Sequence, residues 1–213
     1  MEQSRSQLSG DFWQEKPATV GGMLLQDDVP GLGQAERDEI LAQLPPLEGK
    51  DILELGAGIG RYTSHFVTVA RHVTAVDFVE RFLVENRQTT AAFDNVTYHC
   101  ANVLDMEFEA GSFDFVFWNW LLMYLGDSDI TVLRDMVRSW MRVGGVLFFR
   151  ESCFPGNAGV PPSPDNPATY RPADLYTSLF GSEFKLLRKD NVKAYEQLLN
   201  RSNQNYWLFQ RTG

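Results

Sequence analysis

The stretch Leu53-Glu54-Leu55-Gly56-Ala57-Gly58-Ile59-Gly60-Arg61 decides the fold, because an apolar strand runs directly into a glycine-rich turn. Residues 51–55 are strand-like, and residues 59–70 have the periodicity of a helix. Glycines spaced Gly-x-Gly-x-Gly let the backbone take otherwise strained turns and let a ligand approach without a Cβ in the way. A dinucleotide-binding loop would place its third glycine one residue later. A tight turn packed for shape alone is the alternative interpretation of this stretch.

Strands and helices alternate after this turn. Further strands are expected at residues 72–76, 95–100, 113–118, 146–150, 184–187 and 206–210. Helices are expected at residues 79–92, 127–141 (ending at Gly144-Gly145) and 172–180. Strands joined by helices pair in parallel, so the pattern predicts an α/β fold with a mostly parallel seven-stranded sheet, helices on both faces and a closing antiparallel pair. Ligands then bind beyond the carboxyl ends of the strands.

Two segments lie outside this alternation. Helical patches at residues 7–15 and 34–44, stopped by Pro45-Pro46, predict an N-terminal helical cap over residues 1–49. We expect the cap to form a single structural unit with the domain at residues 50–213. Residues 152–170 form a long loop rich in Gly, Pro and Asn, which is typical of functional loops.

Composition narrows the class of protein. The chain has 213 residues, 44% of them apolar, a net charge of -9 and a pI of about 4.8, so we expect one domain and no nucleic-acid partner. The longest apolar run, residues 115–126, is too short for a bilayer span, and the polar N-terminus predicts no secretion. Two cysteines, Cys100 and Cys153, suit reduced thiols in a cytoplasmic protein. No metal site is expected.

The acids around the glycine loop suggest a ligand. Glu54 would repel a pyrophosphate but could order the loop or receive an ammonium group, and Asp77 ends the next strand, where a carboxylate can accept both hydroxyls of a ribose. The loop resembles motif I of the class I S-adenosylmethionine-dependent methyltransferases, which have a Rossmann-like fold. Asp77 is also compatible with a helix N-cap before Val79.

This resemblance implies a set of cofactor-binding residues. Asn102 stands where the family usually carries an aspartate that binds the adenine amino group, and its amide oxygen can accept the same bond. Phe78 and Val103 either sandwich the adenine or belong to the core. Besides these, the implied residues are Glu54, Gly56, Ala57, Gly58, Gly60, Asp77 and Asn119.

Several runs outside motif I are more specific. They are Asn119-Trp120-Leu121-Leu122-Met123-Tyr124-Leu125, Phe148-Phe149-Arg150-Glu151-Ser152-Cys153-Phe154, Asn166-Pro167-Ala168-Thr169-Tyr170-Arg171 and Arg201-Ser202-Asn203-Gln204-Asn205-Tyr206-Trp207. With Trp13, Met23-Leu24-Leu25 and residues 40–46, they resemble the first methyltransferase domain of the phosphoethanolamine N-methyltransferases of plants and nematodes. The resemblance extends from Trp13 to Gln210.

That family moves a methyl group from S-adenosylmethionine to the amine of phosphoethanolamine, the first step towards phosphocholine, and leaves S-adenosylhomocysteine. The resemblance implies an anionic substrate held by Tyr170, Arg171 and Arg201, with Tyr176 and Trp13 as further substrate contacts. Guanidinium groups bind phosphate in a bidentate manner. Arg150 is a weaker candidate, because it could instead pair with Glu151 or Asp77.

Catalysis needs a neutral amine aimed at the methyl group. In the single-domain protozoan enzymes of this family, a tyrosine near the N-terminus and a histidine after the fourth strand act together. Here the first tyrosine is Tyr62, in the cofactor helix, and Tyr124 stands at the histidine position. We therefore predict Tyr124 and Asn119 as the catalytic residues, with Tyr124 acting as a base or orienting the amine.

Three interpretations remain open at this point. The first is a phosphoethanolamine N-methyltransferase, with a second methyltransferase for later methylations. The second is a methyltransferase for another acceptor, either a free small amine or a protein α-amino terminus. The third is an inactive, cofactor-binding regulatory subunit.

Overall fold

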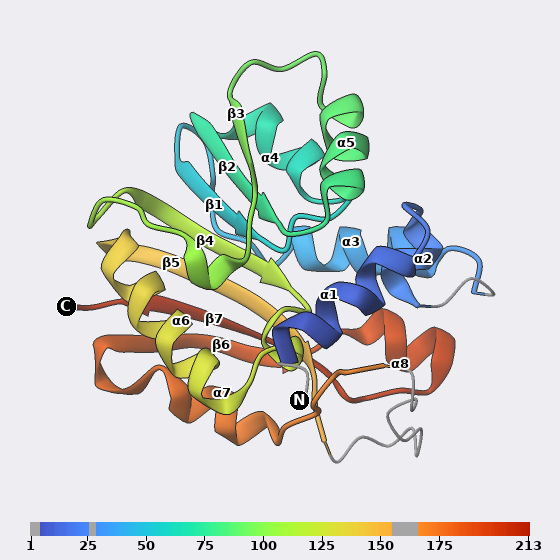
Figure 1. The fold of residues 1–213 in the computed structure, drawn as a ribbon. Helices are drawn as coiled ribbons and strands as arrows, with labels where there is room; N and C mark the ends of the chain where they lie inside the picture. Colours follow the sequence, from blue (N-terminus) through green and yellow to red (C-terminus); the bar gives the residue numbers. More distant parts are fainter. Residues whose placement is uncertain (1–4, 26–28, 155–165) are drawn as a thin grey trace.

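A seven-stranded sheet forms the centre of the computed structural model, which describes residues 5–25, 29–154 and 166–213 (Figure 1). The strands are β1 (Asp51–Leu55), β2 (His72–Asp77), β3 (Val96–Cys100), β4 (Phe113–Asn119), β5 (Met141–Ser152), β6 (Phe184–Asn191) and β7 (Gln204–Arg211), in the spatial order β3-β2-β1-β4-β5-β7-β6. Strands β1 to β5 pair in parallel, and β7 runs antiparallel to β5 and β6. The predicted sheet, including its closing antiparallel pair, is confirmed.

Helices cover both faces of the sheet, as predicted. They are α1 (Arg5–Glu15), α2 (Val20–Leu24), α3 (Leu32–Leu41), α4 (Thr63–Val69), α5 (Glu80–Thr89), α6 (Asp127–Trp140), α7 (Ala173–Leu179) and α8 (Lys193–Leu199). One apolar core lies between the sheet and α6 and α7, and the other between the sheet and α3, α4 and α8. Figure 1 shows α1, α2, α3 and α8 gathered along one side of the molecule. Among the described residues we find no helix with the length and apolarity that a bilayer span requires.

The central strands are apolar on both faces, which explains their continuous hydrophobic runs. Successive side chains of a strand point to opposite faces. In β4, Trp118 enters the core beneath α6 and α7, whereas Phe115 and Phe117 enter the core beneath α3, α4 and α8. In β1, Leu53 enters the core beneath α6 and α7, and Ile52 enters the core beneath α3, α4 and α8. Large apolar residues are therefore needed at both odd and even positions of these strands.

Several predicted boundaries are wrong: the strand expected at residues 184–187 continues to Asn191, and the helix expected to end at residue 44 ends at Leu41. Glycines explain two others. The helix expected from residue 59 begins at Thr63, because Gly58 and Gly60 have positive φ angles and extend the loop after β1. The glycine pair at residues 144–145, predicted to stop a helix, instead lies inside β5, which begins at Met141. The pairing register of β4 and β5 shifts there, and Gly144 has a φ of 83°. Helices α2 and α8 were not predicted.

The cap shares its core with the sheet. Leu24, Leu32 and Ile40 of the N-terminal segment pack in one cluster with Ile52 of β1 and Phe66 of α4. The division at residue 49 stays a prediction. Of the long loop expected at residues 152–170, the part at 155–165, with its proline-rich patch, lies outside the described residues, as do residues 1–4 of the polar N-terminus. Both cysteines are free thiols: Cys153 is buried and Cys100 is exposed.

We predict that Phe149→Ala costs about 3–5 kcal/mol of unfolding free energy, the usual range for removing a buried aromatic ring. Phe149 is 0% exposed, and its ring stacks on Trp118 at 5.0 Å and on Trp207 at 4.9 Å between ring centroids. Urea unfolding measures the change. Phe154→Ala is the control, because this ring is 61% exposed, and it should cost no more than about 0.5 kcal/mol. Equal losses in the two variants would contradict the assigned core.

Candidate active site

The loop after β1 holds three glycines in backbone conformations that other residues rarely adopt. Gly56, Gly58 and Gly60 have φ angles of 70°, 53° and 86°. A Cβ on Gly60 would lie 2.4 Å from Oδ1 of Asn86, and a Cβ on Gly58 would lie 3.2 Å from the sulfur of Met23. Glycine at these positions allows the loop to pass close to both side chains.

Glu54 places a carboxyl group beneath this loop. It is 2% exposed and accepts a hydrogen bond from the Thr63 hydroxyl at 2.6 Å. Burial raises the pKa of Glu54 to about 8, and the negative charge of Asp77 adds to the effect. A buried acid with this pKa is mainly protonated at neutral pH, and a nearby cation would favour its charged form.

Asp77, the last residue of β2, ties the glycine loop to the next strand. Its Oδ2 accepts from the Gly58 amide at 2.8 Å, and its Oδ1 accepts from the Val79 amide at 2.9 Å. The second bond is the capping contact that the sequence also allowed. Burial raises the pKa of Asp77 to about 6. Because a carboxylate offers about four lone-pair sites, it retains capacity for further donors.

Beyond β4, residues 120–125 form a short segment that we call the acceptor loop. The ring of Tyr124 lies in this loop and packs edge-on against Trp13 at 5.4 Å and beside Phe12 at 6.4 Å between centroids. Burial raises the pKa of Tyr124 well above its ordinary value. Its hydroxyl therefore stays protonated at neutral pH, which favours orienting a substrate over removing a proton.

These groups surround a cavity that opens to solvent at the carboxyl ends of β1, β2 and β4. The predicted residues that line it are Trp13, Glu54, Gly56, Ala57, Gly58, Asp77, Phe78, Asn102, Val103, Asn119 and Tyr124. Its largely apolar wall with a few polar groups is typical of small-molecule sites. Sequence analysis did not select Ser9, Met23 or Arg61, which also line it.

Comparison with known proteins shows which proteins the chain resembles. A family model described as a methyltransferase domain matches residues 52–145. Phosphoethanolamine N-methyltransferases of Triticum aestivum and Arabidopsis thaliana are 39% and 36% identical over 94% and 96% of the chain. Phosphoethanolamine N-methyltransferase 1 of Haemonchus contortus, solved with phosphoethanolamine and S-adenosylhomocysteine, matches with a TM-score of 0.91 and 29% identity over 98% of the chain. The chain is similar in sequence to phosphoethanolamine N-methyltransferases over nearly its whole length.

The chain spans less than half the length of these relatives. It covers 42% of the wheat enzyme, 44% of the Arabidopsis enzyme and 49% of the Haemonchus chain. An S-adenosylmethionine-dependent methyltransferase of Leishmania major has the same fold, with a TM-score of 0.81 at 20% identity. The predicted class I methyltransferase fold is confirmed.

Asn102 precedes a short 3₁₀ turn. It stands at the position where an aspartate was expected from the resemblance. Its Oδ1 accepts from the Leu104 amide at 3.0 Å, so the side chain caps the turn Val103–Asp105. It also lines the cavity. Its contact with an adenine stays a prediction. Gly60 lies outside the described lining and backs onto Asn86 instead.

The three residues predicted to hold the phosphate and the further substrate contact Tyr176 fall into two pairs, all outside the described lining of the cavity. Tyr170 and Arg201 are partly exposed, and the positive charge of Arg201 acts on the Tyr170 hydroxyl, whose pKa burial raises. Arg171 and Tyr176 are 3% and 0% exposed. Tyr176 packs against Phe149 in the core. The roles of all four stay predictions, and the contacts of Arg171 and Tyr176 are those of structural residues.

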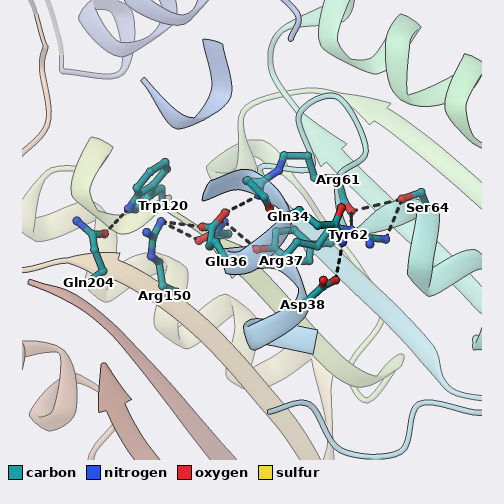
Figure 2. Close-up of polar contacts among 12 residues, drawn as sticks. Gln34, Glu36, Arg37, Asp38, Arg61, Tyr62, Ser64, Trp120, Arg150 and Gln204 are labelled. Carbon is teal, nitrogen blue, oxygen red and sulfur yellow. Dashed lines mark hydrogen bonds and ion pairs between the residues drawn. The ribbon is translucent and has the colours of Figure 1, made fainter. Parts of the chain in front are cut away.

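Sequence analysis missed a buried charge network at the wall of the cavity (Figure 2). Glu36 of α3 is 0% exposed, and its carboxylate pairs with Arg61 of the glycine loop and, at 3.4 Å, with Arg150 of β5. Asn119 accepts from Arg150 at 3.2 Å and donates to Glu36 at 3.3 Å. Arg150 thus has a structural ion-pair partner, as the sequence allowed, but this partner is Glu36 and not Glu151 or Asp77. Arg150 within the apolar run of β5 could have indicated such a network, because a buried charge requires a partner of opposite charge.

Arg150 also makes two cation–π contacts. Its guanidinium carbon lies 3.8 Å from the ring centroid of Trp120 and 4.6 Å from that of Tyr195. Trp120 donates from Nε1 to Gln204 at 3.1 Å, which joins the network to β7 (Figure 2). The network therefore connects α3, the glycine loop, the end of β4 and the C-terminal strands.

We predict that Glu36→Gln lowers the unfolding free energy by about 3–5 kcal/mol, because it leaves two buried guanidinium groups without their counter-charge. Urea unfolding of the variant and of the parent measures the change. The matched control is Glu48→Gln, an exposed position where the same substitution should cost less than about 0.5 kcal/mol. A loss for Glu36→Gln no larger than the control would show that the network contributes little.

Proposed function

We propose that the chain transfers a methyl group from S-adenosylmethionine to the amine of phosphoethanolamine, the first methylation towards phosphocholine. The match to the Haemonchus enzyme carries the proposal, because a TM-score of 0.91 over 98% of this chain relates it to a structure that holds both phosphoethanolamine and S-adenosylhomocysteine. Later methylations would fall to a second methyltransferase, and the cytoplasmic location expected from the sequence belongs to the same proposal.

The cavity residues suit S-adenosylmethionine. Gly56 and Gly58 leave space where a Cβ would stand, Asp77 offers carboxylate lone pairs to ribose hydroxyls, and Glu54 offers a buried carboxyl group to an ammonium. When bound, S-adenosylmethionine would supply a methyl group whose bond to sulfur breaks as its bond to the amine nitrogen forms. Among the described residues no cluster of acids, histidines or cysteines could hold a metal ion.

The protein would act chiefly by positioning the amine. Tyr124 and Asn119 line the cavity at the end of β4, and Trp13 closes the same wall. The Tyr124 hydroxyl oxygen can accept a hydrogen bond from the neutral amine and so aim the nitrogen lone pair at the methyl group. Transfer would give the methylated ammonium, which then releases its proton to water. Tyr170 and Arg201 are the residues we favour for the phosphate group, since both are partly exposed and electrostatically coupled.

The test is methyl transfer from labelled S-adenosylmethionine to phosphoethanolamine, with ethanolamine and a peptide bearing a free α-amine in parallel. Mass spectrometry resolves the products and the number of methyl groups added. We expect transfer to phosphoethanolamine alone. Preferential transfer to ethanolamine or to the peptide would overturn the proposed acceptor. Cofactor binding without transfer to any of the three would favour a different acceptor or a regulatory subunit.

We predict that Asp77→Ala weakens binding of S-adenosylmethionine about tenfold or more, because it removes an acceptor of charge-assisted hydrogen bonds worth roughly 1.5–3 kcal/mol each. Isothermal titration calorimetry measures the dissociation constant. Asp94→Ala, on an exposed residue beyond α5, is the control. An unchanged dissociation constant in a folded Asp77→Ala protein would remove this residue from the cofactor site.

We also predict that cofactor binding at pH 7 releases protons. Free Glu54, with a pKa of about 8, is mainly protonated at this pH, and the ammonium group of the cofactor would favour its charged form. Calorimetry in buffers of different ionisation enthalpy should show the release at pH 7 and its loss at pH 9.5. Glu54→Gln should reduce the release at pH 7, and an identical release in this variant would exclude Glu54 as its source.

A further inference from the structure

The acceptor loop has a backbone that needs external support. Trp120, its first residue, has a φ of 61°, a left-handed conformation that costs a bulky side chain free energy. The loop then makes a short 3₁₀ turn at Leu122–Tyr124 before α6. Trp120, Leu121, Tyr124 and Leu125 all line the cavity. A change in this backbone would therefore move the wall that faces the substrate.

Glu151 of β5 holds the amide side of the loop. Its Oε1 accepts from the amides of Leu121 at 3.0 Å and Leu122 at 2.7 Å, and its Oε2 accepts from the amide of Met123 at 3.2 Å. The side chain is 0% exposed and lies outside the cavity lining formed by the described residues. With both oxygens engaged by backbone donors and no access to the cavity, Glu151 is placed to support the loop and not to remove a proton from the amine.

Arg171 holds the carbonyl side of the same loop. Its Nη1 donates to the Leu122 carbonyl at 2.8 Å and its Nη2 to the Leu125 carbonyl at 2.7 Å, while its Nε donates to Asp127 at 2.9 Å. All three guanidinium nitrogens therefore donate hydrogen bonds, and the residue is 3% exposed. Its own backbone is fixed beside β5 by a bridge to Cys153.

We infer that Glu151 and Arg171 are a pair of positioning residues that set the acceptor-loop backbone from opposite sides and thereby fix Tyr124 in the cavity. Leu122 is held by both residues, through its amide by Glu151 and through its carbonyl by Arg171. The amide of Tyr124 then donates to the Leu121 carbonyl within the turn so fixed. The effect of these residues on catalytic rate rests on the proposed function, whereas their effect on the backbone of the acceptor loop does not.

A first experiment needs no enzymatic activity. Burial raises the pKa of Glu151 to about 7, so the amide resonances of residues 121–123 should titrate together near pH 7 in nuclear magnetic resonance spectra. Other charged and titratable groups lie near Glu151. The positive charge of Arg150 lowers the pKa of Glu151, and the negative charge of Glu151 raises the pKa values of Tyr124, Tyr176 and Cys153. Burial raises the pKa values of the two tyrosines and the cysteine well above this range, so these groups do not titrate near pH 7. Glu151→Gln should abolish the common titration. Amide resonances of residues 121–123 that Glu151→Gln leaves unchanged would overturn the inference.

A second experiment separates positioning from phosphate binding. For Glu151→Gln and Arg171→Lys we expect kcat with phosphoethanolamine to fall about tenfold or more, since small displacements of positioning groups can cost up to about a hundredfold. KM and the cofactor dissociation constant should change less than threefold. A higher KM with unchanged kcat in Arg171→Lys would make Arg171 a phosphate ligand and overturn its positioning role.

Matched controls come from a surface ion pair. Arg138 and Glu183 pair at 2.9 Å with both side chains substantially exposed, so Arg138→Lys and Glu183→Gln should leave both kinetic constants unchanged. Glu151→Asp, which keeps the charge, should recover part of the lost kcat if the carboxylate acts on the loop. If the parent protein shows no transfer to phosphoethanolamine, the proposed function fails, and the effect of Glu151→Gln on the amide resonances of residues 121–123 still decides the positioning role.

Discussion

The buried carboxylate of Glu36 is the interaction on which the site wall depends. Removing a charge from water costs several kcal/mol unless a counter-charge is present, and here two guanidinium groups, from Arg61 and Arg150, provide it. Because the three residues belong to α3, the glycine loop and β5, none of these elements can shift without exposing an unpaired charge to a low-dielectric interior. The cap is therefore held to the sheet by electrostatics as well as by its apolar core, and the cavity between them keeps a defined shape.

The cavity itself collects acids whose charged forms are disfavoured. Glu54 and Asp77 have raised pKa values because burial dominates over their hydrogen bonds. In a protein without a ligand, this arrangement costs stability as the pH rises through these values, because the folded state binds protons more tightly than the unfolded state. A ligand that carries positive charge and hydroxyl donors would relieve the same cost. The site is thus built to be completed by a cationic, polyhydroxylated molecule.

The sheet order and the glycine loop could be predicted because they depend on local pattern. Glycine spacing, strand periodicity and the acid at the end of β2 are each visible within a few residues, and the structure brings Glu54, Gly58 and Asp77 to one cavity as expected. The contacts that failed prediction join distant residues. Glu36 meets Arg150 across more than a hundred positions, and no local pattern specifies that pairing. Boundaries failed where a glycine, as at Gly144, continues a strand through a bulge instead of ending a helix.

Arg150 and Glu151 show how one strand organises both sides of the acceptor loop. They are neighbours in β5, so their side chains point to opposite faces of the sheet. Arg150 joins the Glu36 network and lies against the ring of Trp120, while Glu151 accepts from the amides that follow Trp120. The exit of β4 is thus fixed on one face by a cation and on the other by a carboxyl group. A left-handed conformation at Trp120 can persist there because the contacts on both faces hold the backbone around it, and a strained backbone is kept only where the surrounding structure fixes it in this way.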